Sequence, residues 1–178
     1  MMTNTILEKA AKIRLMIFDV DGVLTDGSLY LGEDGQEYKA FYARDGMGMV
    51  MLQATGVPIG IISARTSPII TYRMQSLKVQ YVFQGQSDKV AAFQQICRQL
   101  QLQPQQVGYM GDDVNDVPVM ILAGLAIAVA DAHWLAAKHA HWQTRANGGR
   151  GAVREACELI MEAQGTLATQ LNRFGICS

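Results

Sequence analysis

The chain has 178 residues, a length typical of one domain that buries its own hydrophobic core. Hydrophobic residues make up 49% of it and charged residues only 17%, a balance that excludes an intrinsically disordered chain. The formal net charge of −1 excludes the overall positive field that attracts nucleic acid or an acidic membrane surface.

Five short apolar runs alternate with longer amphipathic segments along the chain. The runs do not alternate with polar residues, which is typical of strands covered on both faces of a sheet. Strands that alternate with helices predict an α/β fold, a Rossmann-like parallel sheet with helices on both faces. In chain order, the expected strands are Leu15–Phe18, Val57–Ile62, Tyr81–Phe83, Val107–Met110 and Leu125–Val129.

Residues 28–41 interrupt this alternation directly after the first expected strand. Two β-type runs, Ser28–Leu31 and Gln36–Phe41, flank the short segment 33–35, which contains a glycine. Such a loop between two β-type runs predicts a β-hairpin. We expect one domain over residues 1–178 that carries this hairpin as an insertion.

The spacing of apolar residues predicts two clear helices. The first is Ser87–Leu100, with Ser87 as the expected N-cap, and the second is about Ala152–Ala163. Each has an apolar stripe on one side, which we expect to cover a face of the sheet.

The polar residues that follow the expected strands converge on one edge of the sheet. In open α/β sheets this edge binds ligands, because the carboxyl ends of parallel strands meet there. Close carboxylates repel one another unless a cation neutralises them, and oxygen ligands without histidine or cysteine favour Mg²⁺. A magnesium ion beside a lysine and a hydroxyl group is suited to hold a phosphate. The residues are Asp19, Asp21, Thr25, Ser63, Arg65, Gln84, Gln86, Lys89, Asp112, Asp113, Asn115 and Asp116.

Most of these features also have a simpler interpretation. The segment 19–22 is typical of a turn, and Asp112 or Asp113 before a helix is typical of an N-cap. Ser63 could cap the helix that follows Pro68. Lys89 differs from these, because the helix dipole disfavours a lysine in the first helical turn. A cost without local compensation favours a functional role for Lys89.

Four motifs in chain order resemble those of the haloacid dehalogenase (HAD) superfamily. The pattern DxDGxxT matches residues 19–25, and the later motifs are represented by Ser63, Lys89 and residues 111–116. The resemblance implies a HAD-like core and a Mg²⁺-dependent phosphatase that works through an aspartyl-phosphate intermediate.

The same resemblance implies a role for each motif residue. Asp19 would be the nucleophile, while Asp21 would protonate the leaving oxygen and later take a proton from water. Ser63 and Lys89 would hold the transferring phosphoryl group. The implied metal ligands are Asp19, the backbone carbonyl of Asp21 and Asp112, with Asp113 as a further candidate and Asp116 as their support.

Residues 22–27, the hairpin, and residues 44–48 and 146–155 narrow the resemblance to a capless subclass. The subclass implies a homotetramer in which the hairpin and a neighbour's C-terminal segment complete the active site. It implies an eight-carbon sugar-acid phosphate as substrate, in lipopolysaccharide biosynthesis, and a nine-carbon 9-phosphate stays open. Ala64 and Trp134 depart from the subclass pattern, where glycine and proline are expected, and bear on loop shape.

Arginines are the candidates for binding the substrate carboxylate, because a guanidinium group forms paired hydrogen bonds with a carboxylate. A solvated surface position is the alternative for each arginine. The expected substrate-binding residues are Thr25, Arg44, Arg65, Gly149 and Arg150.

Two other functional classes stay open. A receiver domain of a response regulator also places acids, a hydroxyl group and a lysine around Mg²⁺. In receivers the acidic pair comes first and the lysine last, whereas here the acidic pair comes last. A non-catalytic interaction module is disfavoured by the completeness of the motifs. We expect a small-molecule partner, and neither nucleic acid nor a membrane.

The three cysteines are widely spaced, which favours a reducing compartment over a disulfide framework. Residues 1–12 lack the pattern of a signal peptide, and no apolar run in the sequence is long enough to span a membrane. We therefore expect a cytoplasmic protein.

Overall fold

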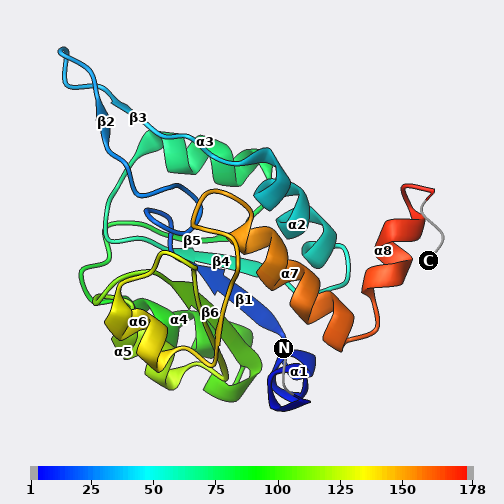
Figure 1. Ribbon diagram of the computed structural model, residues 1–178. Helices are drawn as coiled ribbons and strands as arrows, with labels where there is room; N and C mark the ends of the chain where they lie inside the picture. Colours follow the sequence, from blue (N-terminus) through cyan, green and yellow to red (C-terminus); the bar gives the residue numbers. More distant parts are fainter. Residues whose placement is uncertain (1–3, 176–178) are drawn as a thin grey trace.

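A computed structural model describes residues 4–175, and its centre is one parallel six-stranded sheet (Figure 1). The strand order is β5-β4-β1-β6-β7-β8, and every neighbouring pair is parallel. This confirms the predicted Rossmann-like α/β fold. The strands are β1 (Leu15–Phe18), β4 (Ile59–Ile62), β5 (Tyr81–Phe83), β6 (Val107–Gly111), β7 (Leu125–Ala128) and β8 (Trp142–Gln143).

Helices cover both faces of the sheet, as expected. Successive residues of a strand point to opposite faces, so a strand such as β1 contributes to two buried clusters. In β1, Met16 and Phe18 join one buried cluster, while Leu15 and Ile17 join the other. The first cluster is covered by α1 (Asn4–Ala11), α2 (Ala43–Gln53), α3 (Pro68–Ser76) and α7 (Ala152–Ala163). The second is covered by α4 (Lys89–Leu100), α5 (Val117–Leu122) and α6 (Trp134–His139). The short α8 (Leu167–Asn172) follows α7 at one end of the molecule (Figure 1).

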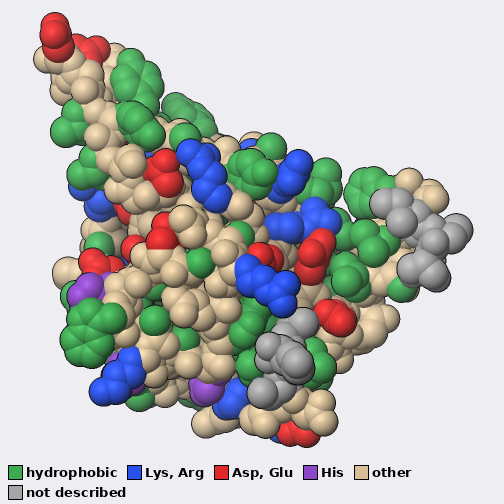
Figure 2. All heavy atoms as spheres, in the orientation of Figure 1, with side chains coloured by type: hydrophobic (Ala, Val, Ile, Leu, Met, Phe, Trp, Pro, Cys, Tyr) green, Lys and Arg blue, Asp and Glu red, His purple; other side chains and the backbone are tan. Residues whose placement is uncertain are grey.

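The predicted hairpin is present, although its paired part is shorter than the two β-type runs Ser28–Leu31 and Gln36–Phe41. Strands β2 (Tyr30–Leu31) and β3 (Glu37–Tyr38) are antiparallel, and Gly35 turns the chain with a φ of 79°. The hairpin projects from the body, with hydrophobic side chains along it and acidic side chains at its tip (Figures 1 and 2). An isolated two-stranded ribbon is only marginally stable, which fits the short pairing.

Two element starts differ from the prediction, each for a local reason. Helix α4 begins at Lys89, and its N-cap is Asp88 rather than Ser87, because the Asp88 carboxylate accepts the Ala91 N–H at 3.1 Å. Strand β4 begins at Ile59, because the preceding Pro58 has no N–H to donate to a neighbouring strand.

No helix within residues 4–175 is both long and apolar enough to cross a membrane. Cys97 and Cys157 are buried and unbonded, and Cys177 lies outside the described residues.

Candidate active site

The carboxyl ends of β1, β4 and β6 open into a pocket of about 330 Å³. After β1 the chain forms β4 and β5 toward one edge of the sheet, and it then crosses back to form β6 on the other flank of β1. The strand order thus reverses at β1, and such a switch point is where open α/β sheets bind ligands. A larger hollow of about 510 Å³ lies between β8 and α7, but two of its glutamates already bond to neighbouring groups. The smaller pocket is lined by Asp19, Asp21, Gly27, Leu29, Ser63, Ala64, Arg65, Asp112, Asp113 and Asn115.

Asp19 follows β1 directly and is only 6% exposed. Its backbone N–H donates to the Met110 carbonyl at 3.0 Å, which continues the sheet pairing to this residue. The Lys89 Nζ lies 2.9 Å from Asp19 Oδ2. Burial and the negative charge of Asp116 raise the pKa of Asp19 to about 7, although Lys89 acts in the opposite direction.

Lys89 lies in the first turn of α4, as predicted, where the helix dipole is unfavourable for a cation. Its Nζ also lies 2.7 Å from Asp116 Oδ1, so it bridges two carboxylates. Burial lowers the pKa of Lys89, but the charges of Asp19 and Asp116 outweigh it, and the net pKa is raised. The ammonium group therefore stays charged, and its two carboxylate partners compensate for the unfavourable helix dipole.

Asp116 is fully buried, and both of its carboxylate oxygens are engaged. Oδ1 accepts the Tyr109 hydroxyl at 2.6 Å as well as Lys89, while Oδ2 accepts the backbone N–H groups of Asp112 and Asp113. These contacts fix the loop after β6. Asp116 thus holds its neighbours in place and has little capacity left to bind a ligand.

Asp112 has the opposite character, since its Oδ1 is the one buried side-chain oxygen between residues 4 and 175 without a hydrogen-bond partner. Burial, together with the charges of Asp116 and Asp19, raises the pKa of Asp112 to about 8. An added Cβ on Gly22, which has a φ of 91°, would collide with this carboxylate. Glycine at position 22 therefore lets the first loop lie against Asp112.

This arrangement fits a divalent cation. One carboxylate oxygen each from Asp19, Asp112 and Asp116 can be chosen so that all lie within 4.8 Å of one another. Asp116 is already saturated, so Asp19 and Asp112 are the carboxylates available to a metal. Asp19 is buried and Asp112 is partly buried, and both have raised pKa values. Two such carboxylates with no histidine or cysteine suit Mg²⁺, which prefers oxygen ligands.

Asp21 lies in the pocket wall with its side chain 20% exposed, and its Oδ1 is 2.5 Å from the Nζ of Lys39. Lys39 follows β3 of the hairpin, and Arg65 Nε lies 3.9 Å from the other oxygen of Asp21. Sequence reasoning missed Lys39. The only signal was the spacing of two residues between Glu37 and Lys39, which puts their side chains on the same side of an extended chain. That spacing does not tell which part of the molecule this side faces.

Ser63 follows β4 and is 1% exposed, although it contributes to the pocket lining. Its backbone N–H donates to the Phe83 carbonyl at 2.8 Å, and its hydroxyl oxygen accepts the Arg65 N–H at 3.2 Å. Ser67, and not Ser63, caps α3 by accepting the Ile69 N–H. The alternative role of Ser63 as a helix cap is therefore wrong.

Of the five expected substrate-binding residues, the structure brings only Arg65 into the pocket lining. The Thr25 hydroxyl is buried, accepts the N–H groups of Gly22 and Gly27, and thus closes the loop after β1. Gly149 packs against the same loop and donates its N–H to the Val23 carbonyl. Both residues therefore hold the loop after β1 in place without lining the pocket.

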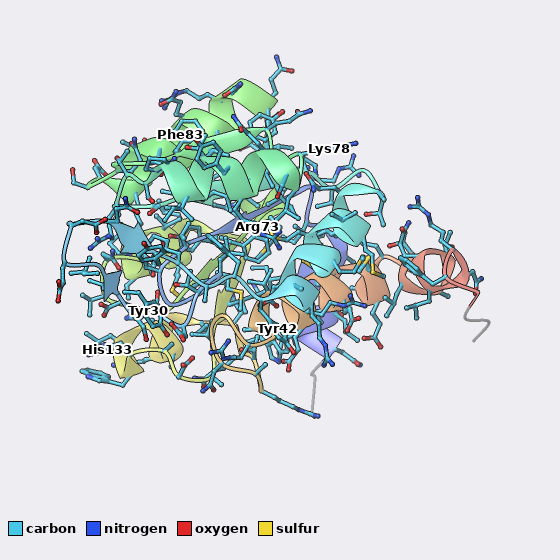
Figure 3. The ribbon with its side chains drawn as sticks, turned by 90° about the horizontal axis from the view of Figure 1, so that it is seen from above. Tyr30, Tyr42, Arg73, Lys78, Phe83 and His133 are labelled. Carbon is cyan, nitrogen blue, oxygen red and sulfur yellow. The ribbon has the colours of Figure 1, made fainter. Side chains whose placement is uncertain are left out.

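The other two arginines, Arg44 and Arg150, are not among the residues that line the pocket in this chain. Arg150 is 59% exposed and lies 3.4 Å from Asp26. Arg44 lies 5.8 Å from the centre of the Tyr42 ring, and Figure 3 shows Tyr42 well separated from Tyr30 of the hairpin. The arginines were predicted only because a guanidinium group binds a carboxylate well. That property is the same for every arginine, so it does not tell which of them reaches the pocket.

Comparison with known proteins agrees with this geometry. The family model of haloacid dehalogenase-like hydrolases matches residues 59–156. The 3-deoxy-D-manno-octulosonate 8-phosphate phosphatase of Yersinia pestis is 48% identical over 92% of this chain and 88% of its own length. That of Escherichia coli K12 is 46% identical over 91% of this chain and 86% of its own.

A solved structure extends the similarity to three dimensions. It is the Moraxella catarrhalis 3-deoxy-D-manno-octulosonate 8-phosphate phosphatase, in complex with magnesium ion, phosphate ion and KDO. Its TM-score is 0.95 at 35% identity, over 97% of this chain and 99% of that one. The chain therefore belongs to the haloacid dehalogenase-like hydrolases, among the 3-deoxy-D-manno-octulosonate 8-phosphate phosphatases.

Proposed function

We propose that the protein is a Mg²⁺-dependent phosphatase that hydrolyses 3-deoxy-D-manno-octulosonate 8-phosphate to 3-deoxy-D-manno-octulosonate (KDO) and inorganic phosphate. Its relatives carry this activity in their names, and one of them binds magnesium, phosphate and KDO. The observation that carries the proposal is the pairing of buried Asp19 with Lys89 beside the unpartnered oxygen of Asp112. The reaction belongs to lipopolysaccharide biosynthesis.

The proposed reaction has two steps at phosphorus. A carboxylate oxygen of Asp19 forms a bond to phosphorus, the bond from phosphorus to the sugar oxygen breaks, and Asp21 gives that oxygen a proton. Asp21 then takes a proton from water, whose oxygen forms a bond to phosphorus while the bond from phosphorus to the Asp19 oxygen breaks, which releases phosphate and restores the Asp19 carboxylate. Both side chains line the same pocket, which supports these roles.

The remaining residues would bind and neutralise the phosphoryl group. The Ser63 hydroxyl and the Lys89 ammonium would stabilise its oxygens. Arg65 would bind the carboxylate of the sugar acid, and its position in the pocket lining supports that role. Mg²⁺, held by the Asp19 and Asp112 carboxylates and the Asp21 carbonyl, would offset the negative charge of the phosphate.

The test is phosphate release from a panel of sugar-acid phosphates, measured with Mg²⁺ and with excess chelator. We expect the eight-carbon 8-phosphate to have the highest kcat/KM, and the chelator to abolish turnover. A higher kcat/KM for a nine-carbon 9-phosphate would reassign the substrate and keep the mechanism. A phosphoenzyme that survives for minutes with no turnover would favour the receiver alternative.

We also propose that the protein is one domain over residues 1–178, forms a homotetramer and works in the cytoplasm. Exposed apolar side chains on the projecting hairpin support an oligomer, because such side chains tend to be buried at interfaces. They are Leu29, Tyr30, Leu31 and Tyr38. The buried, unbonded Cys97 and Cys157 are consistent with a reducing compartment.

A further inference from the structure

Two buried lysines border the pocket, and they are arranged in the same way. Lys89 bridges Asp19 and Asp116, and its side chain is 2% exposed. Lys39 lies 2.5 Å from Asp21 and 2.9 Å from Glu37, and its side chain is 1% exposed. Each lysine therefore joins one aspartate of the pocket to a second acid outside the pocket lining.

The hairpin delivers Lys39 by simple strand geometry. Glu37 and Lys39 are two residues apart, so their side chains share one side of the extended chain, while Tyr38 points to the other side and is 57% exposed. Arg65 Nη2 also lies 3.1 Å from Glu37 Oε1. The base of the hairpin is thus tied by charge to the loops that follow β1 and β4.

Stability alone is a weak reason for this arrangement. Removing an ammonium group from water costs free energy that an ion pair only roughly regains, so buried pairs contribute little net stability. The geometry has a clearer consequence for Asp21. Lys39 engages Oδ1, whereas Oδ2 faces Arg65 Nε at 3.9 Å, beyond hydrogen-bond distance. One oxygen of Asp21 is therefore fixed, and the other is left for exchange of a proton in the pocket.

We propose that Lys39 is a positioning residue that orients the Asp21 carboxyl group for proton transfer to the leaving sugar oxygen. The hairpin would then take part in catalysis within its own chain. Direct contact of Lys39 with substrate is disfavoured, because its side chain is only 1% exposed and does not line the pocket. The inference rests on the proposed phosphatase function and on Asp21 as its acid.

The test compares two leaving groups in the variant Lys39→Met. A sugar-acid phosphate needs its leaving oxygen protonated, whereas p-nitrophenyl phosphate releases a stable phenolate. The value of kcat/KM reports steps up to the first irreversible one, so it isolates this difference from the later attack of water. We expect kcat/KM to fall about 100-fold for the sugar-acid phosphate and less than about fivefold for the aryl phosphate.

The matched control is Lys138→Met, which removes an exposed lysine on α6 and should leave both values unchanged. An equal fall for both substrates, or no fall for the sugar-acid phosphate, would overturn the positioning role. A rise in KM alone would overturn it too, because that result would indicate direct substrate binding.

A second variant keeps the test decisive should Lys39→Met fail to fold. Glu37→Gln retains Lys39 but removes the negative charge of its second partner, and we expect the same selective loss at about fivefold. Equal kcat/KM ratios for wild type and Glu37→Gln would then overturn the proposal. Wild-type protein that hydrolyses neither compound would instead refute the proposed function, and the inference would fall with it.

Discussion

Three neighbouring carboxyl groups near the pocket differ in how many of their oxygens remain free to bind a further group. Asp116 uses both oxygens on Lys89, Tyr109 and backbone N–H groups. Asp19 shares Lys89, and Asp112 leaves one buried oxygen without a partner. The same side-chain type therefore serves as an anchor, a candidate nucleophile and a candidate metal ligand, and the hydrogen bonds decide which.

Magnesium affinity should depend strongly on pH, because the metal competes with protons. Without the metal, the pKa values of about 7 for Asp19 and about 8 for Asp112 mean that both carboxyls are mostly protonated at pH 6. Ionisation on going to pH 8 frees them to bind the cation. Calorimetry should therefore show binding at least about tenfold tighter at pH 8 than at pH 6.

The control for this titration is Asp112→Asn, which removes one proposed ligand charge and should weaken binding at both pH values. Equal wild-type affinity at pH 6 and pH 8 would contradict the assignment of these two carboxylates as ligands.

Much of this site was predictable from the sequence because of where its residues lie in the chain. Asp19, Ser63 and Asp112 each follow a strand, and strand ends of a parallel sheet meet at one edge. Lys39 and the placement of the arginines were not predictable in this way. Their positions depend on how the hairpin and loops fold back, which periodicity does not encode.

At the level of elements, Asp45 joins α2 to the start of α7. It is 1% exposed, and its carboxylate accepts the backbone N–H groups of Gly151 at 3.2 Å and Arg154 at 2.8 Å. Gly151 has no side chain to cap α7, so a residue more than a hundred positions earlier does so. Burial raises the pKa of Asp45, although these two hydrogen bonds act in the opposite direction.

Replacing Asp45 by alanine should lower the free energy of unfolding by about 1–2 kcal/mol, because two helix N–H groups lose their acceptor. Urea denaturation measures the change. Asp45→Asn is the matched control, since its amide oxygen still accepts one N–H, and it should lose less. Equal losses for the two variants would show that the carboxylate charge, and not capping, stabilises the junction.

The edge strand β8 shows why some elements escaped prediction. It has two residues, Trp142 and Gln143, too few for a periodic pattern. Its position is fixed by tertiary contacts, including the His141 Nδ1 that accepts the Ala126 N–H at 2.8 Å. The five longer strands were predictable because their apolar runs are continuous, and four of them are fully buried, whereas the edge strand β5 is half-buried.

For the whole molecule, the proposed burial between subunits would explain both the low share of charged residues, 17%, and the projecting hairpin. Leu31 is 68% exposed and Tyr38 57% exposed in the single chain. A ribbon of two short strands gains stability when another surface covers its apolar side chains. The proposed tetramer would supply that surface.

Light scattering should give a wild-type mass four times that of one chain. The variant Leu31→Glu should shift the protein toward smaller species, because it places a charge in the proposed interface. Ile121→Glu is the control, since Ile121 is 62% exposed on α5, away from the hairpin. A wild-type protein with the mass of one chain would contradict the tetramer.

The central claim is that Asp19 is the nucleophile of a phosphatase, and the variant Asp19→Asn tests it most directly. The amide keeps the size of the side chain but is a much weaker nucleophile than the carboxylate. Phosphate release from 3-deoxy-D-manno-octulosonate 8-phosphate, measured with saturating Mg²⁺, should fall at least about 1,000-fold. Circular dichroism should show an unchanged fold. A correctly folded variant that retains more than about a tenth of the wild-type kcat would contradict the account.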